Sequence, residues 1–238
     1  MRHLLSLLAA AAIGSGYMTA QTIKPMEASV EDYLPLLESA GYMTFPFDLS
    51  ALSDKRYTIT VNIREYENGE IKSANALPWE PTYSNMQLIS DFDKEQQALI
   101  AREVMADPDR GIYSLAEKIN IGFHPIADSL QTVFLDIQNM GSMSYKLKLK
   151  AVRNPSNDTE QYLYGYRPFR MPDTITAGEF IPLVLAGSFW FDKDFNVIRF
   201  CGENTIEPDL SSNIVSSIPH YYVVGIKITP ADSDNKQI

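Results

Sequence analysis

Apolar and polar residues alternate one by one along several segments of this chain, and this period of two restricts its fold more than any other feature. In YTITVNIR, at residues 57–64, apolar residues occupy alternate positions: Tyr57, Ile59, Val61 and Ile63. Side chains of a β-strand point alternately to the two faces of a sheet, so a half-buried antiparallel strand is predicted here. An Asn-Gly pair at 68–69 then predicts a hairpin turn, with Ile71 on the returning strand.

Similar strand candidates fill the second half of the chain. They are residues 119–123, 132–138, 145–152, 161–167, 179–187, 188–191, 196–201 and 221–228. In 145–152 the alternation predicts a buried row, Tyr145, Leu147, Leu149 and Ala151, and a solvated row, Lys146, Lys148 and Lys150. Such a lysine row discourages pairing at a sheet edge, and the alternative is an anion site.

Helical signals are few. A capping motif at 29–32 and Gly41 bracket a first short helix. Residues 93–106 are the best helix candidate, because they are rich in helix formers and stop before a proline. We expect its apolar side to pack on the sheet: Phe92, Leu99, Ile100 and Val104. A further short helix is expected within 210–217, whereas 74–90 is predicted to be a loop.

Many short strands without a βαβ rhythm predict a mainly β (β-rich α+β) fold: an antiparallel two-layer β-sandwich with one or two short helices. The chain has 238 residues, of which 45% are hydrophobic, enough for a packed core. We expect a single β-rich domain over 21–238, with a frayed tail from residue 230 onward. The net charge of −10 argues against binding to nucleic acid or anionic membranes, which favours excess Lys and Arg.

Residues 1–20 have the pattern of a cleaved secretory signal. A basic start precedes an apolar run at 4–13, and small residues follow. The run is too short to span a membrane, which requires roughly 20 residues. Cleavage fits after Ala20 or after Gly16, and we prefer Ala20. No cysteine lies near either position, so a lipoprotein anchor is not expected, and we predict a periplasmic or secreted protein without a transmembrane segment.

Residue types for nucleophilic or metal chemistry are scarce. Cys201 is the only cysteine, so no intrachain disulfide can form, and we expect it to be a small buried residue. His124 and His220 each adjoin a proline and have no partners at the spacings of zinc ligands. The chain also has no G-x-S-x-G nucleophile motif. We therefore expect no catalytic residue of these types, no metal and no cofactor.

The segment FDKDFNVIRFCGE, at 191–203, resembles a calcium loop, because oxygen-bearing residues occupy ligand positions one, three, five and twelve: Asp192, Asp194, Asn196 and Glu203. Position six of such a loop requires Gly for a sharp turn, but here it is Val197, which resists positive φ. The flanking residues also favour strands rather than helices. We interpret 192–195 as a hairpin turn, with a weak surface ion as the alternative.

A row of tyrosines is the most suggestive candidate for ligand binding. Period-two spacing places three rings on one strand face: Tyr162, Tyr164 and Tyr166. An exposed row of rings could stack on sugar rings, and Arg167 and Arg170 could add hydrogen bonds or charge. The alternative is that the row forms the core face of the strand, because the residues on the opposite face would make a poor core.

Three acidic residues follow the strand candidate 196–201: Glu203, Glu207 and Asp209. Two carboxyl groups about 5–9 Å apart in a cleft are sufficient for glycoside hydrolysis. Because the chain has 30 acidic residues, such clusters arise often, and a solvated surface is the alternative.

Three segments together resemble a known family: YTITVNIREYENG, IPLVLAGSFWFDKDFNVIRFCGE and IPHYYVVGIKI. Over residues 25–230 the chain is similar to uncharacterised exported proteins of gut Bacteroidales, which share a domain of unknown function. The resemblance implies a Gram-negative anaerobe and a periplasmic or secreted site. It implies no activity and no catalytic residues.

We therefore hypothesise an exported soluble protein that is not an enzyme and acts in binding or as a cell-envelope component. Its expected partner is a glycan or another envelope protein, and a glycan-binding module built on the tyrosine row is the specific version of this hypothesis. The alternative is a glycan-active hydrolase that uses a carboxylate pair near 203–209.

Overall fold

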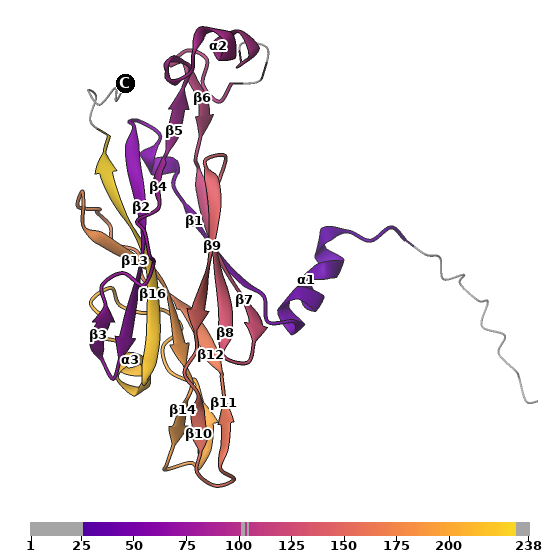
Figure 1. Ribbon diagram of the computed structural model, residues 1–238, viewed down its shortest axis with the longest axis vertical. Helices are drawn as coiled ribbons and strands as arrows, with labels where there is room; N and C mark the ends of the chain where they lie inside the picture. Colours follow the sequence, from indigo (N-terminus) through magenta and orange to yellow (C-terminus); the bar gives the residue numbers. More distant parts are fainter. Residues whose placement is uncertain (1–25, 101–102, 104, 232–238) are drawn as a thin grey trace, which may run out of the picture.

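The computed structural model describes residues 26–100, 103 and 105–231. The predicted signal segment and the end of the predicted tail lie outside these residues. Two antiparallel sheets pack face to face and form the body of the molecule (Figure 1). The predicted β-rich two-layer sandwich is therefore confirmed.

The first sheet consists of β1 (Met43–Asp48), β7 (Lys118–Ala127), β8 (Leu130–Ile137) and β9 (Gly141–Lys148), in that order. The second sheet has the order β12 (Tyr164–Pro168), β13 (Phe180–Ser188), β16 (His220–Pro230), β2 (Tyr57–Glu67) and β3 (Glu70–Ser73), and β4 (Thr82–Ser84) also pairs with β2. Three ribbons pair β5 (Met86–Leu88) with β6 (Ile112–Leu115), β10 (Val152–Asn154) with β11 (Thr159–Gln161), and β14 (Trp190–Asp192) with β15 (Val197–Arg199). The α-helices are α1 (Val30–Ser39), α2 (Lys94–Ile100) and α3 (Asn213–Ser217), and the short 3-10 helices are Ser50–Leu52 and Ile89–Asp91.

The main core lies between the two sheets and is built from alternate residues of their strands. From β2 it takes Ile59, Val61 and Ile63, which confirms the row predicted from the period of two. The first sheet contributes the inward residues of β7, β8 and β9, including Leu147. The predicted Asn-Gly hairpin is also confirmed, because β2 turns at 68–69 into β3.

A second apolar cluster covers the other face of the second sheet. Leu185, Tyr221 and Val223 of the sheet pack there against Ile214 and Ile218. The strand β13 is therefore buried on both faces. This explains why FIPLVLAGS is a continuous apolar run rather than an alternating one.

Local sequence misleads in two segments of the sheets. The predicted loop 74–90 contains β4 and β5, because β2 and β6 supply hydrogen-bonding partners there. In the predicted lysine-bearing strand, β9 stops at Lys148, so Leu149 is only half-buried and Ala151 is exposed. Both segments depend on partners from elsewhere in the chain, which local periodicity does not reveal.

The helix predicted at 93–106 is shorter and lies elsewhere than expected. Of its predicted apolar side, Ile100 is buried, Leu99 is exposed, and Val104 lies outside the described residues. Ala106 donates its N–H to the Tyr113 carbonyl and so belongs to a turn of the β5–β6 ribbon. The helix α2 lies at the end of this ribbon, away from the two sheets (Figure 1).

The helix α1 projects beside the first sheet (Figure 1). Its predicted cap is confirmed, because the Ser29 N–H donates to Asp32 Oδ2 at 2.7 Å. None of its residues is buried, and the exposed ones include Tyr33, Leu34 and Leu36. A hollow of about 690 Å³ separates α1 from the outer face of the first sheet.

Candidate ligand-binding cavity at the tyrosine row

The tyrosine row lies on the edge strand of the second sheet, on the side that faces the first sheet. Tyr164 and Tyr166 belong to β12 and pack against the main core, and Tyr162 precedes the strand. All three are half-buried. The row therefore occupies the core side of its strand, as in the alternative interpretation, rather than an open surface.

Tyr166 connects the two sheets. Its ring stacks on Phe123 of β7, with the ring centroids 4.6 Å apart, and its hydroxyl donates to Gln131 Oε1 of β8 at 2.7 Å. Burial raises the pKa of Tyr166 to about 12, so the hydroxyl stays protonated and acts as a donor at neutral pH.

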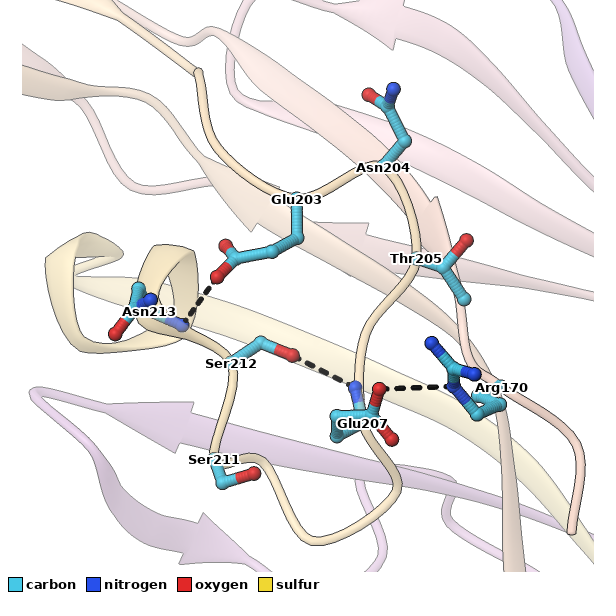
Figure 2. Close-up of a pocket in the computed structure, with 8 residues that line it drawn as sticks. All are labelled: Arg170, Glu203, Asn204, Thr205, Glu207, Ser211, Ser212 and Asn213. Carbon is cyan, nitrogen blue, oxygen red and sulfur yellow. Dashed lines mark hydrogen bonds and ion pairs between the residues drawn. The ribbon is translucent and has the colours of Figure 1, made fainter.

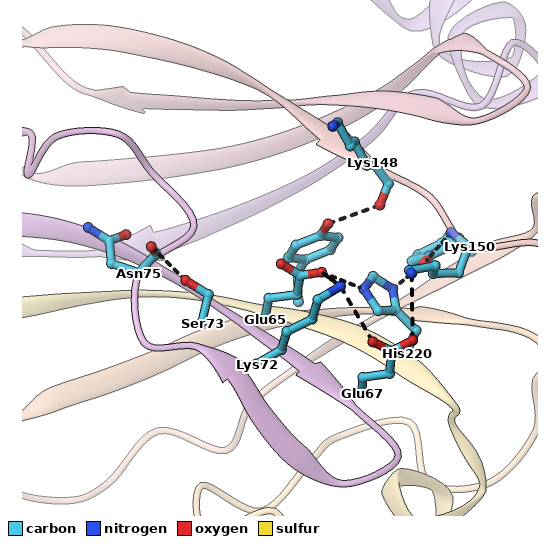
Figure 3. Close-up of polar contacts among 10 residues, drawn as sticks. Glu65, Glu67, Lys72, Ser73, Asn75, Lys148, Lys150 and His220 are labelled. Atoms are coloured by element: carbon cyan, nitrogen blue, oxygen red, sulfur yellow. Dashed lines mark hydrogen bonds and ion pairs between the residues drawn. The ribbon is translucent and has the colours of Figure 1, made fainter.

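Tyr164 belongs to a partly buried polar network. Figure 3 labels its members Glu65, Lys72 and His220. Its hydroxyl accepts the Lys150 backbone N–H at 3.0 Å and lies 2.5 Å from Nδ1 of His220, whose Nε2 lies 3.1 Å from Glu65 Oε1. Lys72 forms ion pairs with Glu65 and Glu67, at 3.1 Å and 3.4 Å. A protonated Tyr164 hydroxyl donates to Nδ1, so Nε2 carries the imidazole hydrogen and donates to Glu65.

Burial sets the protonation of this network. Burial raises the pKa of Tyr164, so its hydroxyl stays protonated at neutral pH. Burial also lowers the pKa of His220, which is 1% exposed and has both ring nitrogens in hydrogen bonds. The network therefore ties β12 to β16 and β2.

A cavity of about 550 Å³ opens beside the tyrosine row, at the end of the sandwich where β8 begins and β7 and β9 end. Four of the residues that the sequence nominates for binding line it: Tyr162, Tyr164, Tyr166 and Arg167. The remaining wall is largely apolar and includes Met43, Leu149, Phe189 and Phe200.

The shape of the cavity depends on Gly165 and on a fixed arginine. A Cβ atom at Gly165 would lie 2.4 Å from the Phe200 ring, so that ring rests directly on the glycine backbone. Arg167 lies over the same ring, with its Cζ atom 4.8 Å from the ring centroid. Its Nε donates to the Glu203 carbonyl at 3.0 Å, and its Nη1 donates to the Tyr166 carbonyl at 2.9 Å. These contacts hold the guanidinium in place before any ligand binds.

Arg170, the fifth nominated residue, lies elsewhere. It is exposed and pairs with Glu207 at 2.9 Å, in a separate shallow hollow that also contains Glu203 (Figure 2). The structure therefore separates Arg170 from the tyrosine cavity and joins it to the acidic cluster.

The acidic cluster has a structural role in this geometry. The Glu203 carboxylate accepts the N–H group of Asn213 at 3.0 Å (Figure 2). It also accepts the N–H group of Ile214 at 3.0 Å and so caps α3. The pKa of Glu203 is lowered by hydrogen bonds from backbone N–H groups. The largest effect comes from the N–H of Glu203 itself, followed by those of Ile214 and Asn213. The pKa of Asp209 is lowered by hydrogen bonds from Ser211, and the side chain of Ser211 has a larger effect than its backbone N–H. A glycosidase needs a carboxyl group whose pKa is raised, and neither shift is in that direction.

The calcium-like segment forms the predicted hairpin turn between β14 and β15. Asp192 Oδ1 accepts the N–H groups of Asp194 and Phe195, at 3.0 Å and 3.2 Å, and its carboxylate also pairs with Arg199. Within the described part of the chain, no group of three or more His, Cys, Asp or Glu residues could hold a metal ion. Cys201 was expected to be buried but is exposed, because the chain leaves the ribbon two residues earlier, at Arg199.

Gln131 is the cavity residue that sequence reasoning missed. It is 2% exposed, and its Nε2 atom has no hydrogen-bond partner among the described residues. It begins the inward row that continues with Val133, Leu135 and Ile137. An amide in an otherwise apolar inward row was the available signal.

Comparison with known proteins identifies a family. A family model described as a domain of unknown function (DUF5041) matches residues 14–230. The chain belongs to the DUF5041 family. Neither the curated proteins nor the solved structures contain a match to it. In the described part of this DUF5041 protein, every helix is too short or too polar to cross a membrane.

Proposed function

We propose that this DUF5041 protein is an exported, non-catalytic binding protein and that its tyrosine cavity receives a sugar ring of a glycan. One observation carries the proposal: four of the five residues nominated from sequence line the same cavity of about 550 Å³. Ligand sites are typically concave, mostly apolar or aromatic, and equipped with a few polar groups, and this cavity has those properties.

The polar groups beside the cavity already serve structural contacts. The Tyr164 hydroxyl and both ring nitrogens of His220 lie in hydrogen bonds with each other, with Lys150 and with Glu65. The alternative, a hydrolase acting through 203–209, gains little support, because the carboxylate of Glu203 caps a helix and that of Glu207 is paired with Arg170.

Export to the periplasm or the cell exterior is part of the proposal. It is supported by the apolar run at 4–13, followed by small residues near Ala20. Fractionation of the producing bacterium, with N-terminal sequencing of the recovered protein, tests it. A protein recovered from the cytoplasm with its first residues intact would contradict export.

Binding is tested with the purified mature protein on a glycan array and by calorimetric titration of the glycans that bind. We expect Tyr162→Ala to weaken binding roughly tenfold, because an aromatic contact and its buried area are lost. Tyr33→Ala, on exposed α1, is the matched control and should bind like the wild type. The absence of binding to any glycan by a folded protein would overturn the proposed function.

A further inference from the structure

Gln131 is the one residue of the cavity that combines deep burial with an unpartnered polar atom. It lies at the start of β8, is 2% exposed, and lines the tyrosine cavity. Its Oε1 accepts the Tyr166 hydroxyl at 2.7 Å, and its Nε2 has no partner among the residues that the structure describes. A buried N–H donor without an acceptor is costly, and either an ordered water or an acceptor from a ligand can satisfy it.

The orientation of this amide is determined by its neighbour. The Tyr166 ring is stacked on Phe123, so the position of its hydroxyl is restrained. A protonated hydroxyl that donates to Gln131 selects Oε1 as the acceptor. The free Nε2 is therefore a preorganised donor rather than a mobile surface amide.

Two other polar side chains of the cavity, Tyr164 and Arg167, already make hydrogen bonds within the protein. The Tyr164 hydroxyl bonds to His220 and to the Lys150 N–H, and Arg167 donates to two backbone carbonyls. Around them the wall is apolar, with Met43, Leu149, Phe189 and Phe200. A ligand that presents an acceptor to the Gln131 amide and apolar atoms to this wall fits the arrangement.

We propose that the cavity selects an N-acetylated amino sugar, whose acetamido carbonyl accepts a hydrogen bond from Gln131 Nε2. This inference rests on the proposed glycan-binding function and names the sugar class. The acetyl methyl group lies against the apolar wall. A hydroxyl group in the same place would be buried without a hydrogen-bond partner, which costs free energy. Selectivity follows because a site built around one buried hydrogen bond rejects analogues that lack the complementary group.

The test uses sugar pairs that differ by the acetamido group: N-acetylglucosamine with glucose, N-acetylgalactosamine with galactose, and N-acetylmannosamine with mannose. Each is titrated into the unaltered mature protein and followed by calorimetry and ligand-observed NMR. We expect one acetylated sugar to bind at least roughly tenfold more tightly than its partner. Because this comparison uses the unaltered protein, it remains decisive even if a variant does not fold.

Two variants test whether the selectivity for the acetylated sugar comes from the Gln131 amide. Gln131→Met keeps the size of the side chain but removes the donor, and Gln131→Glu replaces the donor by an acceptor. Both should reduce affinity for the acetylated sugar roughly tenfold or more, whereas Gln161→Met, on exposed β11, should not.

The outcomes separate the two proposals. Equal affinity within every pair, or unchanged binding by folded Gln131→Met, overturns the acetamido inference and leaves glycan binding in place. The absence of any glycan binding on the array overturns the proposed function and this inference with it.

Discussion

Glu65 on β2 and His220 on β16 meet across the second sheet, with Oε1 of the glutamate 3.1 Å from Nε2 of the histidine. The histidine is 1% exposed and is held from its other side by Tyr164. Burial lowers the pKa of His220 more than the nearby Glu65 and Glu67 carboxylates raise it. This contact therefore links the edge strand of the cavity to the middle of the sheet through a neutral imidazole.

We expect the free energy of unfolding to fall as the pH drops below the ordinary histidine pKa of about 6.5. The pKa of His220 is lower in the folded chain, so below that value the unfolded chain takes up a proton first and stability is lost. Above it both states are neutral and the contribution is complete. Urea unfolding over this pH window should show a weaker pH dependence for His220→Gln than for the wild type.

His124→Gln is the control for that experiment, because His124 stacks on Tyr42 outside the network. It should keep the pH dependence of the wild type. If His220→Gln and the wild type respond equally to pH, the neutral buried histidine is disproved.

Gly165→Ala should lower the free energy of unfolding by about 1–3 kcal/mol, because overpacking forces neighbouring groups to move. The new Cβ would lie 2.4 Å from Phe200, whose ring forms part of the cavity wall. Gly122→Ala is the matched strand control, since its Cβ would have no neighbour closer than 3.6 Å. Urea unfolding compares the two variants, and equal stability would contradict the close packing of Phe200 on Gly165.

Leu135→Ala should cost about 2–5 kcal/mol, the range for large-to-small substitutions in a packed core. Leu135 is 1% exposed, between the two sheets. Leu36→Ala, on α1 and 64% exposed, should change stability by less than about 0.5 kcal/mol. Denaturant unfolding measures both, and a large loss in Leu36→Ala would show that α1 is packed more tightly than its exposure indicates.

Glu203→Gln should destabilise the protein at neutral pH, because the charged cap of α3 is lost. In the folded chain the pKa of Glu203 is held below its usual value of 4.5 by hydrogen bonds from backbone N–H groups. The N–H of Glu203 itself has the largest effect, followed by those of Ile214 and Asn213. This contribution is complete above that value and is lost as the pH falls through the folded pKa. Thermal melts should therefore show a gap from the wild type that narrows toward acidic pH, and a constant gap would argue against the carboxylate cap.

Strands with one buried face were predictable from sequence, whereas strands that depend on remote partners were not. Ile59, Val61 and Ile63 follow the period of two because one side of β2 meets the core. The strand β4 has no such signal and exists because residues 58–60 of β2 pair with it. Cys201 illustrates the same limit, because its exposure depends on where a ribbon ends.

The cavity also combines features that were predictable from sequence with features that were not. Spacing alone places Tyr164 and Tyr166 on one face, but it does not say which partner that face meets. Arg167 and Arg170 are close in sequence, yet one lines the cavity and the other pairs with Glu207. The role of Gln131 follows from contacts with Tyr166, thirty-five positions away.

The order of apolar and polar residues by itself determined that this chain forms β-strands with defined inner and outer faces, because side-chain direction in a strand repeats every second residue. It also determined the β2–β3 hairpin through the local geometry of Asn-Gly. Only the tertiary structure decided which strands became neighbours, which rings faced a cavity, and which amide remained without a partner. These outcomes depend on contacts between residues far apart in the sequence, and no local pattern encodes such contacts.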